Sequence, residues 1–214
     1  MEYFIRTFEN TVRRCWDKPA LDEYRTSSET YGQLAADIEA IHIYFKAAGL
    51  KPGDKIAINA RSSASWIKTF MAAVSGGYVA VELFNGYTAR DAQALVDHSD
   101  SRLLFTEKGI YKDMDFSAMP QLLGVIDLRS GELLDSRGDF AKIYAQRDQL
   151  FVQAHPTGMT PAEVHYPERG MDELCAIMYT SGSTGFPKGV MLTVRNFSAN
   201  IDMIPSHCPY REGD

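Results

Sequence analysis

The amino-acid sequence predicts an α/β fold in which helices cover both faces of a mainly parallel sheet. Short apolar runs typical of buried strands alternate along the chain with amphipathic helical patterns. Helix-capping signals mark where several of these helices begin. A strand, a helix and a further strand at this spacing favour crossover connections between parallel strands. We expect the sheet to include residues 56–59, 79–81, 103–105, 125–127 and 176–179.

The first two helices are predicted from the spacing of their apolar residues. The first carries four of them at intervals of four: Phe4, Phe8, Val12 and Trp16. Thr30 and Gln33 form a capping box that opens the second helix, which ends at Gly49. The apolar face of this second helix holds Leu34, Ile38, Ile41 and Phe45. We interpret Trp16 and Trp66 as packing residues.

The middle of the chain continues the alternation. A Pro52-Gly53 turn precedes a strand pattern. Ser62 or Ser63 caps the next helix, and Thr88 with Asp91 forms a capping box for the helix after that. The strand patterns around these helices cover residues 55–60, 78–83, 103–106 and 123–128.

Residues 129–172 differ in composition, because they are charged, hold three prolines and contain few apolar runs. We expect a peripheral helix followed by a surface loop there, with a solvated connection favoured over a role in substrate recognition. Residues 190–193 are expected to extend a turn. Thr193 is then expected to cap a helix over residues 193–204.

Composition narrows the function classes. Lysine and arginine total 22 against 28 aspartates and glutamates, a net charge of −6, and no basic tract indicates nucleic acid or an anionic membrane surface. The three cysteines are scattered and no signal peptide is apparent, which predicts reduced thiols and a cytoplasmic location. No stretch of about 18 consecutive apolar residues is present, so no transmembrane segment is expected. Peripheral contact with a membrane stays open.

The stretch YTSGSTGFPKG, residues 179–189, is the most informative part of the chain. A Gly-rich loop brings backbone N–H groups against an anion, hydroxyls add donors, and a lysine adds a positive charge. We therefore predict a phosphate cradle, and Lys188 is its candidate catalytic residue. The candidate phosphate-binding residues are Thr180, Ser181, Gly182, Ser183, Thr184, Gly185 and Lys188. The alternative is an ordinary Gly/Ser turn after a strand, which the length of the pattern and the lysine disfavour.

Three better-known motifs do not fit this segment. Walker A requires Gly before its Lys and Ser or Thr after it, whereas Pro187 and Gly189 flank Lys188. A nucleophile elbow centred on Ser183 would need Gly at Ser181. No stretch supplies the dinucleotide pattern G-x-G-x-x-G.

The same segment resembles the Gly-rich signature of the AMP-forming adenylate synthetases, the superfamily of acyl-CoA synthetases, peptide-synthetase adenylation domains and luciferases. Residues 179–185 and 187–189 each fit the family pattern. The resemblance continues upstream through residues 49–66, 72–85 and 92–105 and covers most of the chain.

The resemblance implies that residues 1–214 are the amino-terminal portion of an adenylation domain, with the rest of that domain and a small carboxyl-terminal domain absent. It implies ATP, Mg²⁺ and coenzyme A as cofactors and co-substrates. A carboxylate would attack the α-phosphate of ATP to give an acyl-adenylate, and coenzyme A would then displace AMP. Because the groups that hold adenosine lie further along in relatives, we expect the 214-residue chain alone to be inactive and assign no metal ligand in it.

The segment GFPKGVMLT, residues 185–193, most resembles the corresponding segment of long-chain fatty acid–CoA ligases, which implies a long-chain fatty acid as substrate. Two alternatives stay open. One is a ligase of the same superfamily that forms an aryl- or amino-acid adenylate, and the other is a non-catalytic nucleotide-binding module. A downstream Tyr-Gly-x-Thr-Glu, a Thr-Gly-Asp and a carboxyl-terminal Lys would favour an enzyme.

Two positions depart from the family pattern: Val194 stands where relatives often carry His, and Glu82 where many carry the Pro that ends a strand. Tyr179 is expected either in the core or at the nucleotide, with neither favoured. Three histidines are interpreted as surface or lightly packed residues and not as metal ligands: His155, His165 and His207.

Overall fold

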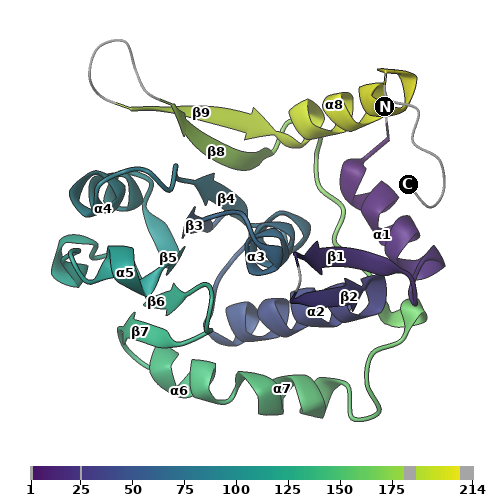
Figure 1. Cartoon of the computed structure of the whole chain (residues 1–214), viewed down its shortest axis with the longest axis horizontal. Coiled ribbons are helices and arrows are strands. Elements are labelled where there is room, and N and C mark those ends of the chain that lie inside the picture. The colour runs from purple at the N-terminus through teal and green to yellow at the C-terminus, as the bar shows by residue number, and fades with distance from the viewer. Residues whose placement is uncertain (1, 25, 181–186, 208–214) are drawn as a thin grey trace.

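The computed structural model describes residues 2–24, 26–180 and 187–207 and is built on one seven-stranded sheet. The strand order is β7-β6-β5-β3-β4-β8-β9, with β1 and β2 in a separate hairpin (Figure 1). The strands of the large sheet are β3 Lys55–Asn59, β4 Val79–Glu82, β5 Ser101–Thr106, β6 Gly124–Asp127, β7 Leu133–Ser136, β8 Leu174–Thr180 and β9 Lys188–Thr193.

All five strands expected from the sequence lie in this sheet and pair in parallel, in the order β6-β5-β3-β4-β8. The fold-class prediction is confirmed. The two outermost strands, β7 and β9, pair antiparallel with their neighbours. Each follows its partner strand after only a few residues of sequence, as is usual for antiparallel neighbours. The prediction that residues 190–193 only extend a turn is wrong.

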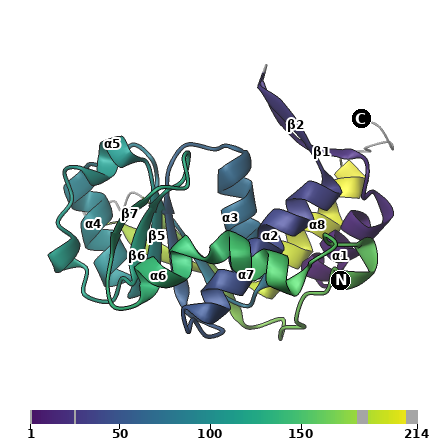
Figure 2. The same ribbon diagram turned by 90° about the horizontal axis from the view of Figure 1, so that it is seen from below.

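Alternate residues of each central strand enter two separate cores. In β3, Ile56 and Ile58 belong to the cluster formed with α2 Tyr31–Ala47 and α3 Ala64–Ser75. Ala57 belongs to the other, formed with α4 Ala89–His98. Helices therefore cover both faces, and Figure 2 shows α4 and α5 across the strands from α2 and α3.

The helix caps form as the sequence predicts. Thr30 and Gln33 make both bonds of a capping box at α2. Ser63, the second of the two candidate serines, accepts a hydrogen bond from the Trp66 N–H at the start of α3. Thr88 accepts one from the Asp91 N–H at the start of α4.

The first helix, α1 Phe4–Arg14, is shorter than expected. Trp16 follows its end and packs against the main core, so its predicted packing role is confirmed although its helical placement is wrong. A Cβ atom at Gly32 would lie 2.6 Å from the Trp16 ring, so only glycine fits there. The last helix, α8 Val194–His207, begins as predicted after Thr193, whose hydroxyl accepts from the Asn196 N–H.

The hairpin of β1 Pro19–Glu23 and β2 Ser27–Thr30 was not predicted. β2 is entirely polar, and β1 holds apolar residues only at its start, so neither strand shows the alternating pattern that signals a half-buried strand. The hairpin extends away from the large sheet (Figure 2).

Residues 129–172 are not the solvated connection that we expected. They contain β7, two helices in place of one, α6 Phe140–Ala145 and α7 Arg147–Ala154, and a turn of 3₁₀ helix at Pro161–Glu163. Another 3₁₀ turn, Phe116–Ala118, lies earlier in the chain, before β6. Val164 and Tyr166 are buried against the main core. Glu9 of α1, itself buried, accepts a hydrogen bond from the Tyr166 N–H at 2.9 Å, which ties this segment to the amino-terminal helix.

The remaining short helix is α5 Lys108–Tyr111. Among the described helices, none combines the length and the apolar character needed to cross a membrane.

Candidate functional site

The Gly-rich segment lies between β8 and β9. Tyr179 pairs with Gly189 and Thr180 with Lys188, and the Thr180 hydroxyl donates to the Lys188 carbonyl oxygen at 3.5 Å. The antiparallel pairing therefore holds the two ends of the segment side by side. Thr180 and Lys188 are exposed. The other predicted phosphate-binding residues lie outside the described residues: Ser181, Gly182, Ser183, Thr184 and Gly185.

Gly189, which follows the candidate lysine, is required by close packing. A Cβ atom there would lie 3.0 Å from Cγ2 of Ile177 and 3.3 Å from the Tyr179 ring. Real side chains rarely pack so tightly, so a larger residue would push β9 away from β8. The glycine thus positions the strand that begins at Lys188.

The hairpin borders the point where the chain connections change faces of the sheet. The chain leaves β3 for α3 on one face and leaves the neighbouring β4 for α4 on the other. In open α/β sheets, ligands bind outside the carboxyl ends of the strands at such a switch point. β8 is the next strand after β4, so the Gly-rich segment follows a strand adjacent to the switch point.

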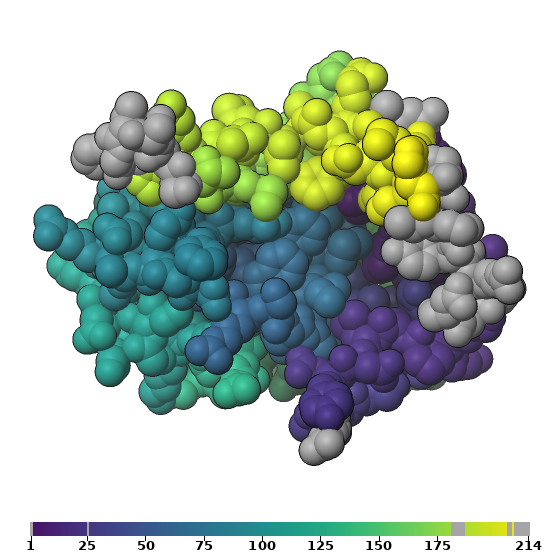
Figure 3. Space-filling view, turned by 45° about the horizontal axis from the view of Figure 1, so that its top comes forward, coloured from purple at the N-terminus to yellow at the C-terminus, as the bar shows by residue number. Residues whose placement is uncertain are grey.

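A cavity of about 320 Å³ opens at this switch point. It is lined by Ala60, Ser62, Trp66, Glu82, Leu83, Phe84, Asn85, Met178 and Tyr179. The lining comes from the segments that follow β3 and β4 and from the end of β8. In the space-filling view, the yellow-green surface of the hairpin runs along the edge of the molecule above the blue region that holds α3 (Figure 3).

Tyr179 takes the core placement, one of the two that the sequence left open, and contact with a nucleotide stays a prediction. Its ring is buried in the core cluster that includes α4, and it also lines the cavity. The phenol oxygen lies 2.7 Å from Nδ1 of His98, and burial, with a smaller contribution from Asp100, raises the phenol pKa. Tyr87 donates to the Tyr179 carbonyl oxygen at 3.4 Å.

Glu82 stands at the end of β4 in place of the expected proline, and the strand ends there nevertheless. Desolvation raises the pKa of its carboxyl group. Within the described part of the chain, this carboxylate has no hydrogen-bond or ion-pair partner. A carboxylate held half-buried on the wall of a cavity favours a ligand that can donate a hydrogen bond to it.

Asn59 and His98 also support the site, and the sequence did not single them out. Asn59 is completely buried at the end of β3, where its Nδ2 donates to the Phe84 carbonyl oxygen at 3.1 Å. Its Oδ1 has no partner among the described residues. Asn59 could have been found from the sequence, because it is a polar residue at the end of an apolar strand. His98 could not, because only its tertiary contact with Tyr179 indicates a role.

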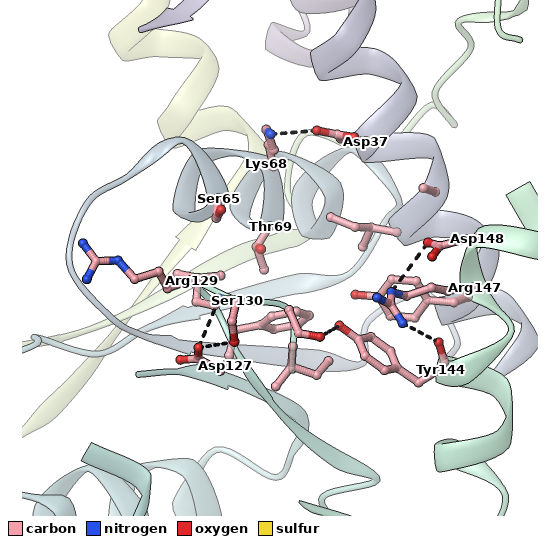
Figure 4. Close-up of a pocket in the computed structure, with 17 residues that line it drawn as sticks. Asp37, Ser65, Lys68, Thr69, Asp127, Arg129, Ser130, Tyr144, Arg147 and Asp148 are labelled. Atoms are coloured by element: carbon pink, nitrogen blue, oxygen red, sulfur yellow. Dashed lines mark hydrogen bonds and ion pairs between the residues drawn. The ribbon is translucent and has the colours of Figure 1, made fainter. Parts of the chain in front are cut away.

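A second cavity, of about 440 Å³, lies between α2, α3, the segment after β6 and α7 (Figure 4). The charge of Lys68 in its wall is neutralised: Lys68 donates to Glu29 and lies 2.7 Å from Asp37. Burial lowers the pKa of Lys68, but hydrogen bonds to these two carboxylates outweigh it and the pKa is raised overall. We interpret this cluster as a structural ion-pair network.

The histidines form no metal centre. Among the described residues, no group of three or more His, Cys, Asp and Glu side chains is placed to hold a metal ion. His155 lies 3.1 Å from Glu163 and His165 lies 3.8 Å from Glu9, so both contact carboxylates.

Comparison with known proteins gives a consistent result. A protein-family model described as AMP-binding enzyme matches residues 8–214. The chain is 27% identical over 207 residues to an oxalate–CoA ligase of Arabidopsis thaliana, covering 96% of this chain and 38% of that protein. It is 28% identical over 214 residues to long-chain-fatty-acid–CoA ligase 1 of Saccharomyces cerevisiae, covering 90% of this chain and 30% of that protein.

The fold matches solved structures as well. The anthranilate CoA ligase AuaEII, in complex with anthranoyl-AMP, superposes with a TM-score of 0.75 at 16% identity, covering 94% of this chain and 36% of that one. At 16% identity this match is evidence for the fold alone. The chain spans between 30% and 38% of the length of these three proteins.

Proposed function

The chain belongs to the AMP-binding enzyme family, and from this premise we propose that it forms the phosphate-binding part of an adenylate-forming acid–thiol ligase. The reaction would activate a carboxylic acid with ATP, release pyrophosphate and transfer the acyl group to coenzyme A. The observation that carries the proposal is the pairing of Thr180 with Lys188, which holds both ends of the Gly-rich segment beside the switch-point cavity.

The first half-reaction explains what this arrangement would do. As the carboxylate attacks the α-phosphate, negative charge builds on the phosphorus and on the departing pyrophosphate. Lys188 would offset that charge, and the Thr180 hydroxyl and backbone N–H groups of the segment would orient the phosphates. These groups act by position and charge, and no covalent intermediate forms on the protein.

The switch-point cavity would take the acid or the thiol, because it opens beside the end of β8 where the activated carboxyl group would lie. Trp66, Phe84 and Met178 give it an apolar wall, while Glu82 and Tyr179 are its ionisable groups. Mg²⁺ is expected to accompany ATP, but the described residues contain no protein site suited to a metal ion, so we derive no step through it.

Within this reaction class we propose a long-chain fatty acid as the substrate. Support comes from the sequence of residues 185–193, GFPKGVMLT, and from the similarity to the yeast long-chain ligase. The oxalate–CoA ligase is similar to nearly the same degree. A panel of palmitate, oxalate, anthranilate and free amino acids in one assay therefore decides the substrate class.

The test is ATP–pyrophosphate exchange in the longest protein that the gene encodes, since the chain spans only part of the length of its relatives. Lys188→Ala should abolish most of the exchange supported by the preferred acid. Lys142→Ala is the matched control, because Lys142 is an exposed lysine on α6. Equal exchange in wild type and Lys188→Ala would show that the segment is scaffolding, and no exchange with any acid in wild type would favour a non-catalytic module.

A further inference from the structure

A third cavity, of about 420 Å³, has no residue of β8 or β9 in its lining and has no role in the proposed reaction. It spans the carboxyl ends of three adjacent strands, because Ala60 and Arg61 follow β3, Glu107 follows β5, and Leu128 and Arg129 follow β6. In the sheet, β4 separates these strands from β8. The carboxyl edge of a parallel sheet is where ligands bind in such folds.

Two other elements complete the walls of this cavity. The first turn of α3 and the residues just before it contribute serine hydroxyls from Ser62, Ser63 and Ser65. The β1–β2 hairpin contributes Glu23, Thr26 and Ser27.

Two exposed arginines, Arg61 and Arg129, line this cavity. Neither the Arg61 nor the Arg129 side chain makes a hydrogen bond, ion pair or aromatic contact with any residue that the structure describes. Figure 4 shows the Arg129 guanidinium directed away from the Lys68–Asp37 pair and from Arg147. Arg129 lines both this cavity and the second cavity, the one beside Lys68. Its positive charge is therefore available to a ligand in the third cavity. An arginine offers five donors and no acceptor, so the unsatisfied groups here are donors.

Two carboxylates also line the cavity, and both are already engaged with the backbone. Glu23 accepts a hydrogen bond from the Ala64 N–H at 2.8 Å, at the amino-terminus of α3. Glu107 accepts one from the Arg61 N–H at 3.1 Å. Neither carboxylate forms an ion pair with the two guanidinium groups, so the arginines stay free to bind an added acceptor.

We propose that this cavity binds a phosphate group, either as inorganic phosphate or as the monoester of a small molecule. Two arginine forks that approach from different strands can each bind a pair of oxygens, which suits a tetrahedral anion better than a planar carboxylate. The serine hydroxyls supply further donors. Ala60 and Ser62 line both this cavity and the switch-point cavity, but no residue of β8 or β9 lines this one. The proposed phosphate site therefore differs from the one proposed for ATP and does not depend on the ligase activity.

The test is a titration followed by amide chemical shifts in ¹⁵N-labelled protein at low ionic strength. The probes are inorganic phosphate, glycerol 3-phosphate and acetate. We expect saturable shifts at Arg61, Ser62 and Ser65 with the two phosphate probes and weaker binding of acetate. Tighter binding of glycerol 3-phosphate than of inorganic phosphate would identify a monoester as the ligand, and the reverse order would identify the free ion.

Charge variants then assign the binding. Arg61→Gln and Arg129→Gln should each weaken phosphate binding about tenfold, as for the loss of one charge-assisted contact. Glu23→Gln should strengthen it, because it removes a negative charge from the wall. Arg14→Gln, which changes an exposed arginine on α1, should leave it unchanged.

The Gly-rich segment could also bind phosphate, so Lys188→Ala separates the two sites. In the proposed arrangement, the shifts at Arg61 and Ser65 persist in Lys188→Ala. The proposal is overturned if those shifts disappear in Lys188→Ala, or if Arg61→Gln and Arg129→Gln bind phosphate as tightly as Arg14→Gln. Thermal unfolding of each variant confirms that the protein remains folded.

Discussion

Thr180 and Lys188 are register partners across the β8–β9 hairpin, with the Thr180 hydroxyl bonded to the Lys188 carbonyl oxygen at 3.5 Å. The lysine that would contact the phosphates is therefore held as the first residue of strand β9. Sites built on strands hold their geometry better than sites built on loops. This arrangement lets the charge of Lys188 be tested apart from its position.

Replacing Lys188 with Ala should lower ATP–pyrophosphate exchange by ~10²- to 10³-fold, the usual loss for one well-placed donor at a developing charge. Because Lys188 is exposed, the free energy of unfolding should change by no more than about 0.5 kcal/mol. Urea denaturation and exchange assays on the same preparations check both numbers. A large loss of stability would mean that the lysine supports the fold.

Replacing Gly189 with Ala should, unlike Lys188→Ala, lower the stability of the fold. The added Cβ would lie 3.0 Å from the Ile177 methyl group, so the Ile177 side chain or β9 must give by a few tenths of an ångström, and we expect the free energy of unfolding to fall by about 1–3 kcal/mol. Exchange should also fall, because Lys188 moves with the strand. Gly109→Ala is the control, since a Cβ atom at Gly109 meets nothing within 4 Å. Similar stability of the two variants would contradict the close packing.

Glu82 should make the protein less stable as the pH rises. Burial raises the pKa of its carboxyl in the folded state above the ordinary value of 4.5, so the folded state binds the proton more tightly than the unfolded state does. The stability that Glu82 contributes is therefore present below pH 4.5 and is lost as the pH rises through the folded pKa. Glu82→Gln should be more stable than wild type at pH 7, by up to about 1 kcal/mol.

The measurement for Glu82 is urea denaturation of both proteins from pH 4 to pH 8. The difference between them isolates this one carboxyl group from the others that titrate. It should shrink toward pH 4, and a constant difference would point to a packing effect of the substitution instead.

Glu9 should be the most important charged residue for stability in the amino-terminal half. It is 1% exposed, lies within 3.2 Å of both Arg6 and Arg13, and accepts from the Tyr166 N–H. Glu9→Gln should cost roughly 2 to 3 kcal/mol, because bonds to an ionised acceptor are lost in a buried position. Glu168→Gln, which removes an exposed partner of Arg6, should cost little. Equal effects would show that burial of Glu9 does not matter.

Most of the central sheet could be predicted from the sequence. β3, β5 and β8 each contain an uninterrupted apolar run of three or more residues. The caps at Thr30, Ser63 and Thr88 depend on residues three positions away. Such signals are local, so neighbours along the chain are enough to determine them. The Gly-rich string is local in the same sense, and its residue types alone predicted a phosphate-binding segment.

Contacts between distant residues were decided only by the tertiary structure. The short strands β7 and β9 carry weak local patterns and form because β6 and β8 offer open edges to pair with. Tyr166 is buried against Phe8 of α1 and His42 of α2, and its N–H donates to Glu9, more than 150 residues away in the sequence. His98 meets Tyr179, and Arg61 shares a cavity with Arg129, because parallel strands far apart in sequence end at one edge. No local sequence preference encodes these contacts, since they depend on the spatial order of the strands in the sheet.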